Sequence, residues 1–192
     1  GAWWWLTGKP DTIIAQAQHC ADLLYPHKAK LTLGFWLDCE CWHAGYTAGS
    51  NRDMVLRFID TFEARAQMPV RGIYTRQTSW DSFVSPHARW AMLDLWAARY
   101  NAALISPWGD GRFKFRDWQT WRFWQYSADG NGLGQKYGAP PPPAADADID
   151  LDRWYSSLDD LYVYAGLESA PITMAEKVDI LWAHYLEDHN VT

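Results

Sequence analysis

The sequence predicts an α/β protein, because short apolar runs alternate along the chain with amphipathic stretches at helical spacing. Segments rich in proline and glycine separate these runs, as expected for loops between strands and helices. A chain of 192 residues can bury a sizeable core in one domain with an appendage. The expected strands cover residues 2–6, 33–42, 70–75, 93–100, 121–126 and 149–152.

Helices are expected where apolar residues recur every three or four positions. Pro10 begins the first helix, which reaches Leu24 and ends before Pro26. Ser50 and Asp53 predict the capped start of a second helix, which stops before the proline at position 69. Two shorter helices are expected at residues 79–84 and 155–165.

Two loops interrupt the second half of the chain. Residues 101–117 are rich in glycine, proline and charge, and residues 128–145 contain a run of four prolines that predicts a polyproline spacer. The short strand at 149–152 then alternates, so that Asp150 and Asp152 share one face. A solvated edge strand is the alternative interpretation of that alternation.

Residues 168–192 are expected to form a linker and an amphipathic helix outside a main domain of residues 1–167. Thr173 and Glu176 predict a capping box at the start of this helix. Its apolar stripe needs a surface to pack against. We therefore expect either self-association through residues 173–187 or packing on the main domain.

Residues 33–42 carry the most informative pattern for function. In a strand, two-residue alternation puts Asp38 and Glu40 on one face, between Trp36 and Trp42. The opposite face is apolar and consists of Leu33, Phe35, Leu37, Cys39 and Cys41. Glycosidic cleavage usually needs one neutral carboxylic acid and one ionised group, and an indole wall or a second carboxylate raises the pKa of a carboxyl. The pattern favours sugar chemistry, with a strand end bearing two solvated acids as the alternative.

Composition and charge argue against several classes of partner. The formal net charge of -6 comes without the clustered Lys and Arg that phosphate binding needs, so no nucleic-acid partner is expected. No apolar run approaches the roughly 18 residues of a transmembrane helix, and no signal peptide is visible, so no membrane partner is expected. Fourteen Trp and ten Tyr favour a carbohydrate ligand, because indole faces stack on sugar rings.

The cysteines and histidines predict neither a disulfide framework nor a metal site. Cys20, Cys39 and Cys41 are odd in number, and the last two are too close in sequence to bridge easily, so buried thiols are expected. The sequence has no C-x-x-C or H-E-x-x-H motif, and its six histidines are scattered. We expect no metal and no cofactor, with His43 in a loop beside the acid pair.

Six segments carry recognisable motifs in a fixed order. They are residues 1–5 (G-A-W-W-W), 37–40 (L-D-C-E), 73–75 (I-Y-T), 95–100 (L-W-A-A-R-Y), 123–127 (F-W-Q-Y-S) and 149–154 (I-D-L-D-R-W). Together they resemble the G-x-Y-H-F, D-x-E, I-Y-T, L-W-x-A-x-Y, W-Q-Y and V-D-L-N-x-F strands of the glycoside hydrolase family 25 lysozymes, the muramidases of phages, bacteria and some fungi. Each motif alone is weak, but six in register across residues 1 to about 165 are specific.

The resemblance implies an irregular TIM-like β/α barrel with a C-terminal helical extension, and a cleft at the carboxyl ends of its strands. It also implies a hydrolase that cleaves the β-1,4 bond between N-acetylmuramic acid and N-acetylglucosamine in bacterial peptidoglycan. Retention of configuration, assisted by the substrate's N-acetyl group, is the outcome that the family favours. The spacing of the two acids alone leaves both retention and inversion open.

The resemblance assigns roles to individual residues as well. Glu40 would be the general acid, Asp38 its partner at the substrate's acetamido group, and Asp150 a third carboxylate of the site. Six aromatic side chains could line the sugar subsites or instead fill the barrel. These are Trp36, Tyr74, Trp96, Tyr100, Trp124 and Tyr126.

Two differences from the family pattern affect these expectations. The family begins with an Asp-Val-Ser strand, a helix and a second strand, none of which precedes Gly1 in this sequence. We therefore expect an N-terminally incomplete barrel domain that either lacks one catalytic carboxylate or receives it from an upstream segment or another polypeptide. A companion segment or a particle subunit would also cover the exposed strand edge. Trp4 stands where the family usually has His, which removes a polar side chain from the cleft.

These differences keep two alternatives open. One is a muramidase-like domain that binds glycan, or forms a structural part of a phage tail or similar particle, without cleaving anything. The other is a sugar-processing enzyme of another barrel family that uses the same acid pair. In each case we expect the chain to reach the cell wall by lysis, as a phage endolysin does, or on a phage-like particle.

Overall fold

The computed structural model describes residues 1–43, 45–100, 114–128 and 150–167 of the chain. The chain divides into two compact units, Gly1–Ser156 and Ser157–Thr192. This division places the helix after residue 157 in the second unit, whereas the sequence-based prediction placed it in the first. Among the described residues, no helix is long and apolar enough to cross a membrane.

The first unit is built on one sheet whose six strands lie in the order in which they follow along the chain. They are β1 (Ala2–Trp5), β2 (Phe35–Asp38), β3 (Val70–Arg76), β4 (Asp94–Ala98), β5 (Phe123–Ser127) and β6 (Leu151–Trp154). Strands β1 to β5 run parallel, and β6 is antiparallel to β5. Parallel neighbours need crossover connections, and helices between the first strands supply them.

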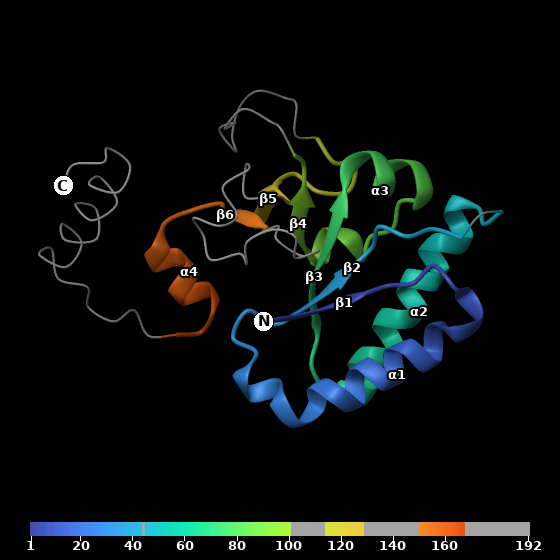
Figure 1. Ribbon diagram of the computed structural model, residues 1–192, viewed down its shortest axis with the longest axis horizontal. Coiled ribbons are helices and arrows are strands. Elements are labelled where there is room, and N and C mark those ends of the chain that lie inside the picture. The colour runs from blue at the N-terminus through green and yellow to red at the C-terminus, as the bar shows by residue number, and fades with distance from the viewer. Residues whose placement is uncertain (44, 101–113, 129–149, 168–192) are drawn as a thin grey trace, which may run out of the picture. The chain divides into compact units, whose positions relative to one another are not determined.

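The helices of the described chain, with the 3-10 turns η1 to η3, follow this alternation. They are η1 (Pro10–Thr12), α1 (Ile13–Leu24), η2 (Tyr25–Lys30), α2 (Ala48–Ala66), α3 (Gln77–Phe83), η3 (Trp90–Met92) and α4 (Leu158–Tyr164). Figure 1 shows α1 and α2 lying alongside each other, next to the edge of the sheet that β1 and β2 form. The alternation of strands and helices confirms the predicted α/β class.

The hydrophobic core joins this helix pair to one face of the sheet. Ala17 of α1 and Phe62 of α2 belong to the same buried cluster as Phe35 and Leu37 of β2. The rings of Phe35 and Phe62 stack with their centroids 4.1 Å apart. The predicted apolar face of the β2 segment is therefore confirmed at Phe35, Leu37 and Cys39, which are all fully buried.

Three predicted boundaries differ from the structure. Strand β2 ends at Asp38, so Glu40 follows the strand instead of lying within it. Thr47 is the N-cap of α2, and its hydroxyl accepts the Ser50 backbone N–H at 3.1 Å. Helical geometry also continues past Leu24, because Pro26 lies in the first turn of η2, where its missing N–H is tolerated.

Gly72 explains how a bulky aromatic fits against the centre of the sheet. It pairs with Trp36 of β2 on one side and with Asp94 of β4 on the other. A Cβ atom at Gly72 would overlap the Trp36 ring and the Asp94 carbonyl oxygen. The absence of a side chain at this position lets the indole of Trp36 lie against β3.

The second unit begins with a short capped helix. The Ser157 hydroxyl accepts the Asp160 backbone N–H, and the Asp160 carboxylate accepts the Ser157 backbone N–H, which completes a capping box for α4. The predicted C-terminal helix and its self-association lie outside the described residues. The same holds for the predicted polyproline spacer and most of the two predicted loops.

Candidate active site

The two acids of the D-x-E segment lie where β2 ends. The Cys39 backbone between them is tied to β3, since its N–H donates to the Tyr74 carbonyl at 2.9 Å and its carbonyl accepts the Thr75 hydroxyl at 2.7 Å. The Cys39 side chain is fully buried on the opposite side, in the core. These anchors hold Asp38 and Glu40 at the carboxyl end of the sheet, where parallel α/β folds bind their ligands.

Both carboxylates border a hollow of about 240 Å³, which we call the acid hollow. Its lining residues are Trp3, Asp38, Glu40, Tyr74, Trp96, Tyr100, Gln125 and Asp150. Trp3 belongs to β1 and Asp150 directly precedes β6, although these two strands are at opposite ends of the sheet order. The sheet must therefore be curled, so that its two ends approach a common hollow.

A hydrogen-bond network organises the far wall of the acid hollow. The hydroxyl groups of Tyr74 and Tyr100 both donate to Oε1 of Gln125, each at 2.6 Å. With its carbonyl oxygen engaged in this way, the Gln125 side chain can donate through its amide to Asp150, a hydrogen bond that lowers the pKa of that carboxyl. Burial has the larger and opposite effect, so the pKa of Asp150 is raised. Burial also raises the pKa of Tyr74, which remains a neutral donor.

Asp38 lies in an environment that disfavours its charge. Burial and the neighbouring Glu40 raise the pKa of Asp38 from 3.8 to about 7, while Arg76 acts in the opposite direction. Its buried Oδ1 has no hydrogen-bond partner among the described residues. A buried carboxyl oxygen without a partner, at the edge of a hollow, is a candidate ligand-binding atom.

Glu40 is held by a cation from the neighbouring strand. Nε of Arg76, the last residue of β3, lies 2.8 Å from Oε1 of Glu40. The Glu40 side chain is 25% exposed and the Arg76 side chain 50% exposed, so this ion pair lies at the solvent boundary of the site. The Arg76 guanidinium also lies over the Tyr100 ring, 5.0 Å from its centroid.

A second and wider hollow adjoins the acid pair, and we call it the outer groove. It has a volume of about 800 Å³ and is lined by Glu40, Trp42, His43, Gly45, Tyr46, Arg76, Thr78, Ser79 and Phe83. Trp42 donates from its indole nitrogen to the Ser79 hydroxyl at 2.6 Å and stacks on Phe83. Glu40 therefore borders both hollows, with aromatic faces available on each side of it.

Comparison with known proteins identifies the family. The family model described as glycosyl hydrolases family 25 matches residues 1–135, which is well over half of the chain. This chain belongs to glycosyl hydrolase family 25. A comparison with curated protein sequences finds no match.

Several solved structures share the fold of the family 25 chain at low sequence identity. The spore cortex lytic enzyme SleM of Clostridium perfringens is 21% identical with a TM-score of 0.57, over 83% of this chain and 50% of that one. A muramidase from Acremonium alcalophilum is 21% identical with a TM-score of 0.55, over 86% of this chain and 72% of that one. The lysozyme of Streptomyces coelicolor is 20% identical with a TM-score of 0.52, over 78% of this chain and 65% of that one. The family 25 chain thus spans about half the length of SleM and more of the other two.

The structure sorts the six predicted substrate-binding aromatics of this family 25 chain. Tyr74, Trp96 and Tyr100 line the acid hollow. Trp36 is buried and borders a separate apolar hollow beside Trp3 and Trp96, packing edge-on against Trp96 at 5.8 Å.

Two of the six aromatics lie on the other side of β5. Trp124 is 1% exposed in the hydrophobic core and donates its indole N–H to the Arg99 carbonyl at 3.0 Å. Tyr126 packs against the same core. Strand alternation turns Gln125 toward the acid hollow and turns these two neighbours away from it. Trp124 and Tyr126 line neither the acid hollow nor the outer groove, and the burial of Trp124 agrees with the alternative that such a residue fills the barrel.

Sequence reasoning missed several residues that the structure brings to the site. The alternation of side chains along β5 could have indicated Gln125. Arg76 could have been found as a polar residue at the carboxyl end of a strand.

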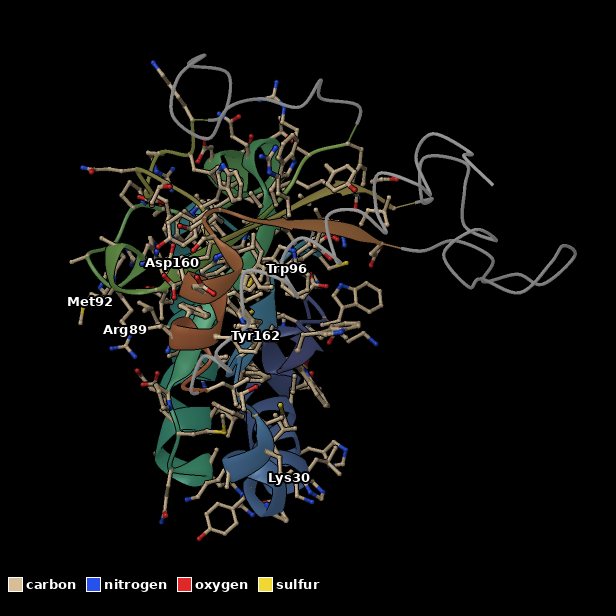
Figure 2. All side chains as sticks on the ribbon, turned by 90° about the vertical axis from the view of Figure 1, so that its left-hand side faces the viewer. Lys30, Arg89, Met92, Trp96, Asp160 and Tyr162 are labelled. Carbon is tan, nitrogen blue, oxygen red and sulfur yellow. The ribbon has the colours of Figure 1, made fainter. Side chains whose placement is uncertain are left out.

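Asp152 accepts the Trp96 indole N–H at 2.7 Å. Burial raises the pKa of Asp152 to about 6, Trp96 acts against this shift and Asp150 adds to it. Trp96 lies near the middle of the packed side chains in Figure 2.

Among the described residues, no group of three or more His, Cys, Asp or Glu side chains could hold a metal ion. The three cysteines are free. Burial raises the pKa of Cys20 to about 12 and that of Cys39 well above its usual value. The two hollows are lined by carboxylates, a guanidinium and aromatic side chains.

Proposed function

We propose that this chain is a peptidoglycan hydrolase that cleaves the β-1,4 bond between N-acetylmuramic acid and N-acetylglucosamine. The observation that carries this proposal is the position of Glu40, which borders the acid hollow on one side and the outer groove on the other. A glycan lying across Glu40 would place one sugar in each hollow and the bond between them beside a carboxyl group. Membership of family 25 and the fold shared with lysozymes and muramidases support the same activity.

The proposed mechanism uses three carboxyl groups. Glu40 donates a proton to the glycosidic oxygen as the bond to the anomeric carbon breaks. The substrate's acetamido carbonyl attacks that carbon, and Asp38 accepts the acetamido N–H, which orients the group. Water, deprotonated by Glu40, then opens the cyclic intermediate with net retention of configuration. Asp150, linked to Gln125, lies across the acid hollow, where a negative charge stabilises the developing positive charge on the sugar.

The first test is mass spectrometry of the fragments released from purified peptidoglycan by the 192-residue chain. We expect muropeptides with muramic acid at the reducing end. Glu40→Gln should lower release by roughly a hundredfold or more, since it removes the proton donor. Asp53→Asn is the matched control, because it changes the net charge equally at an exposed carboxylate on α2.

The other outcomes of this test separate the remaining functions. Fragments with N-acetylglucosamine at the reducing end would contradict the proposed bond specificity. If peptidoglycan is bound but no fragments are released, the chain is a glycan-binding or structural component without hydrolytic activity. Proton NMR of the first anomer formed decides the stereochemistry, and an initial α-anomer would overturn the retaining mechanism. The proposed site of action is the bacterial cell wall.

A further inference from the structure

The outer groove contains a flat aromatic surface that the proposed reaction does not use. Trp42 and Phe83 both line the groove, and their rings lie within 19° of parallel with centroids 6.4 Å apart. Nearly parallel rings at this distance are offset from each other, so their faces are turned in nearly the same direction. Phe83 is 47% exposed, which leaves part of its ring open to a ligand. We call these two rings the aromatic platform.

Both rings of the aromatic platform are anchored to the rest of the domain. The indole N–H of Trp42 donates to the Ser79 hydroxyl at 2.6 Å, and the indole packs edge-on against buried Trp80 at 6.3 Å. Phe83 ends α3, and its carbonyl accepts the side-chain amide of fully buried Asn51 at 2.9 Å. A surface that is already held in place loses little conformational entropy when a ligand binds. The platform is therefore preformed.

The course of α3 sets the direction of the groove. This helix directly follows Arg76, which lies beside Glu40, and its seven residues extend about 10 Å at the helical rise. Ser79 and Phe83 are four residues apart on α3, so they share one helix face, and both line the groove. The platform thus begins near Glu40 at Trp42, which Ser79 holds, and ends one helical turn farther away at Phe83.

The size and chemistry of the outer groove suit more than one sugar ring. Its volume is about 800 Å³, whereas the acid hollow, which would take a single sugar, has about 240 Å³. Thr78 and Ser79 bring hydroxyl groups to the lining beside the platform. Aromatic faces for the apolar side of a sugar ring, with hydroxyl groups beside them, form a surface that matches a glycan.

We propose that Trp42 and Phe83 bind the leaving-group side of the glycan, with the first sugar beyond the cleaved bond on Trp42 and the second on Phe83. This inference rests on the proposed hydrolysis. The proposed bond specificity makes the first of these sugars N-acetylglucosamine and the second the next N-acetylmuramic acid. The two aromatic residues are then specificity-determining, and the preferred substrate has at least two sugars beyond the cleaved bond.

The test uses two peptide-free oligosaccharides that each contain one cleavable bond. The trisaccharide N-acetylglucosamine–N-acetylmuramic acid–N-acetylglucosamine has one sugar beyond that bond, and the tetrasaccharide has a further N-acetylmuramic acid at its reducing end. Both release the same disaccharide, which mass spectrometry quantifies. For the wild-type chain, we expect kcat/KM to be roughly tenfold or more higher on the tetrasaccharide, because only this substrate reaches the Phe83 ring.

Variants of Phe83 give the discriminating result. Phe83→Leu keeps an apolar side chain and removes the flat face, so it should lower kcat/KM roughly tenfold on the tetrasaccharide and far less on the trisaccharide. Phe83→Tyr keeps the ring and should keep the preference for the longer substrate. Tyr25→Leu is the matched control, because Tyr25 is 46% exposed on η2 and lies outside both hollows. Thermal unfolding of each variant checks that it is folded.

Two results would overturn the inference. If Phe83→Leu loses activity equally on both oligosaccharides, Phe83 supports the fold of the groove and contacts no second sugar. If the wild type cleaves both at equal rates, the outer groove binds no second sugar. Failure of the proposed hydrolysis looks different, because the wild type then cleaves neither substrate. In that case titration calorimetry decides: tighter binding of the tetrasaccharide by the wild type but not by Phe83→Leu supports the platform, and equal affinities overturn it.

Discussion

Asp38 shows how opposing charges determine the chemistry of a single residue. It ends β2, is largely buried, has Glu40 as a near neighbour and has Arg76 close enough to act against both effects. The balance raises its pKa from 3.8 to about 7, so that a substantial fraction of the carboxyl is protonated at neutral pH. Such a group can change between accepting and donating a hydrogen bond to the acetamido group of a sugar.

The raised pKa of Asp38 predicts a pH-dependent penalty on folding. The native state holds this proton more tightly than the unfolded chain does, so stability falls as the pH rises from about 4 to about 7. Asp38→Asn removes the ionisation. We expect its free energy of unfolding to exceed that of the wild type by roughly 1–4 kcal/mol at about pH 8, with no gain at about pH 4. Urea unfolding at the two pH values measures this difference.

Asp22 provides the control for this prediction. Its hydrogen bond from Arg65 lowers the pKa of the carboxyl, so its contribution to stability is present above 3.8 and is lost on acidification. Asp22→Asn should therefore give no gain in stability at about pH 8. Equal destabilisation by Asp38→Asn at both pH values would show that the native state does not disfavour the charged form of the Asp38 carboxyl.

At the scale of elements, β5 shows where local sequence patterns are insufficient. Its segment is aromatic almost throughout, so sequence alone did not reveal which side chains face the site. Pairing with β4 and β6 places Trp124 in the core and Gln125 at the acid hollow. Gln125, the polar residue of the W-Q-Y motif, is the one that connects the two tyrosines to Asp150.

The packing of β2 against β3 can be tested at Gly72. Because a Cβ there would overlap the Trp36 ring and the Asp94 carbonyl, Gly72→Ala should lower the free energy of unfolding by about 1–3 kcal/mol. Gly49→Ala makes the same chemical change in the first turn of α2, where the nearest atom to a new Cβ is 3.7 Å away. That control should be neutral or stabilising by up to about 1 kcal/mol. Equal effects of the two substitutions in urea unfolding would refute the packing argument.

For the molecule as a whole, the site depends on the curl of the sheet. Trp3 from β1 and Asp150 beside β6 border one hollow because the two ends of the strand order approach each other. Trp3 is 62% exposed, so its indole offers an open face to a ligand at the acid hollow. By contrast, Met92 on η3 is 74% exposed and projects outward in Figure 2.

The contribution of β1 can be measured by truncating this indole. Trp3→Ala should weaken binding of soluble peptidoglycan strands roughly tenfold, because it removes a stacking face while leaving the buried core unchanged. Tyr25→Ala, at an exposed aromatic on η2, should leave the affinity as it is. Calorimetry in the Glu40→Gln background, where no turnover occurs, gives the affinities. An unchanged affinity in the Trp3 variant would exclude β1 from glycan binding.

The sequence by itself determined the α/β class, the positions of the strands along the chain and the apolar face of β2, because hydrophobic periodicity and turn residues are local properties. It also indicated the Asp38 and Glu40 pair, since two acids between two indoles are visible in a ten-residue stretch. Only the tertiary structure decided that Arg76 holds Glu40 and that Gln125 joins two tyrosines. Those contacts, and the burial that shifts the pKa of Asp38, depend on the pairing of strands in the sheet, which brings together residues that are far apart in the chain.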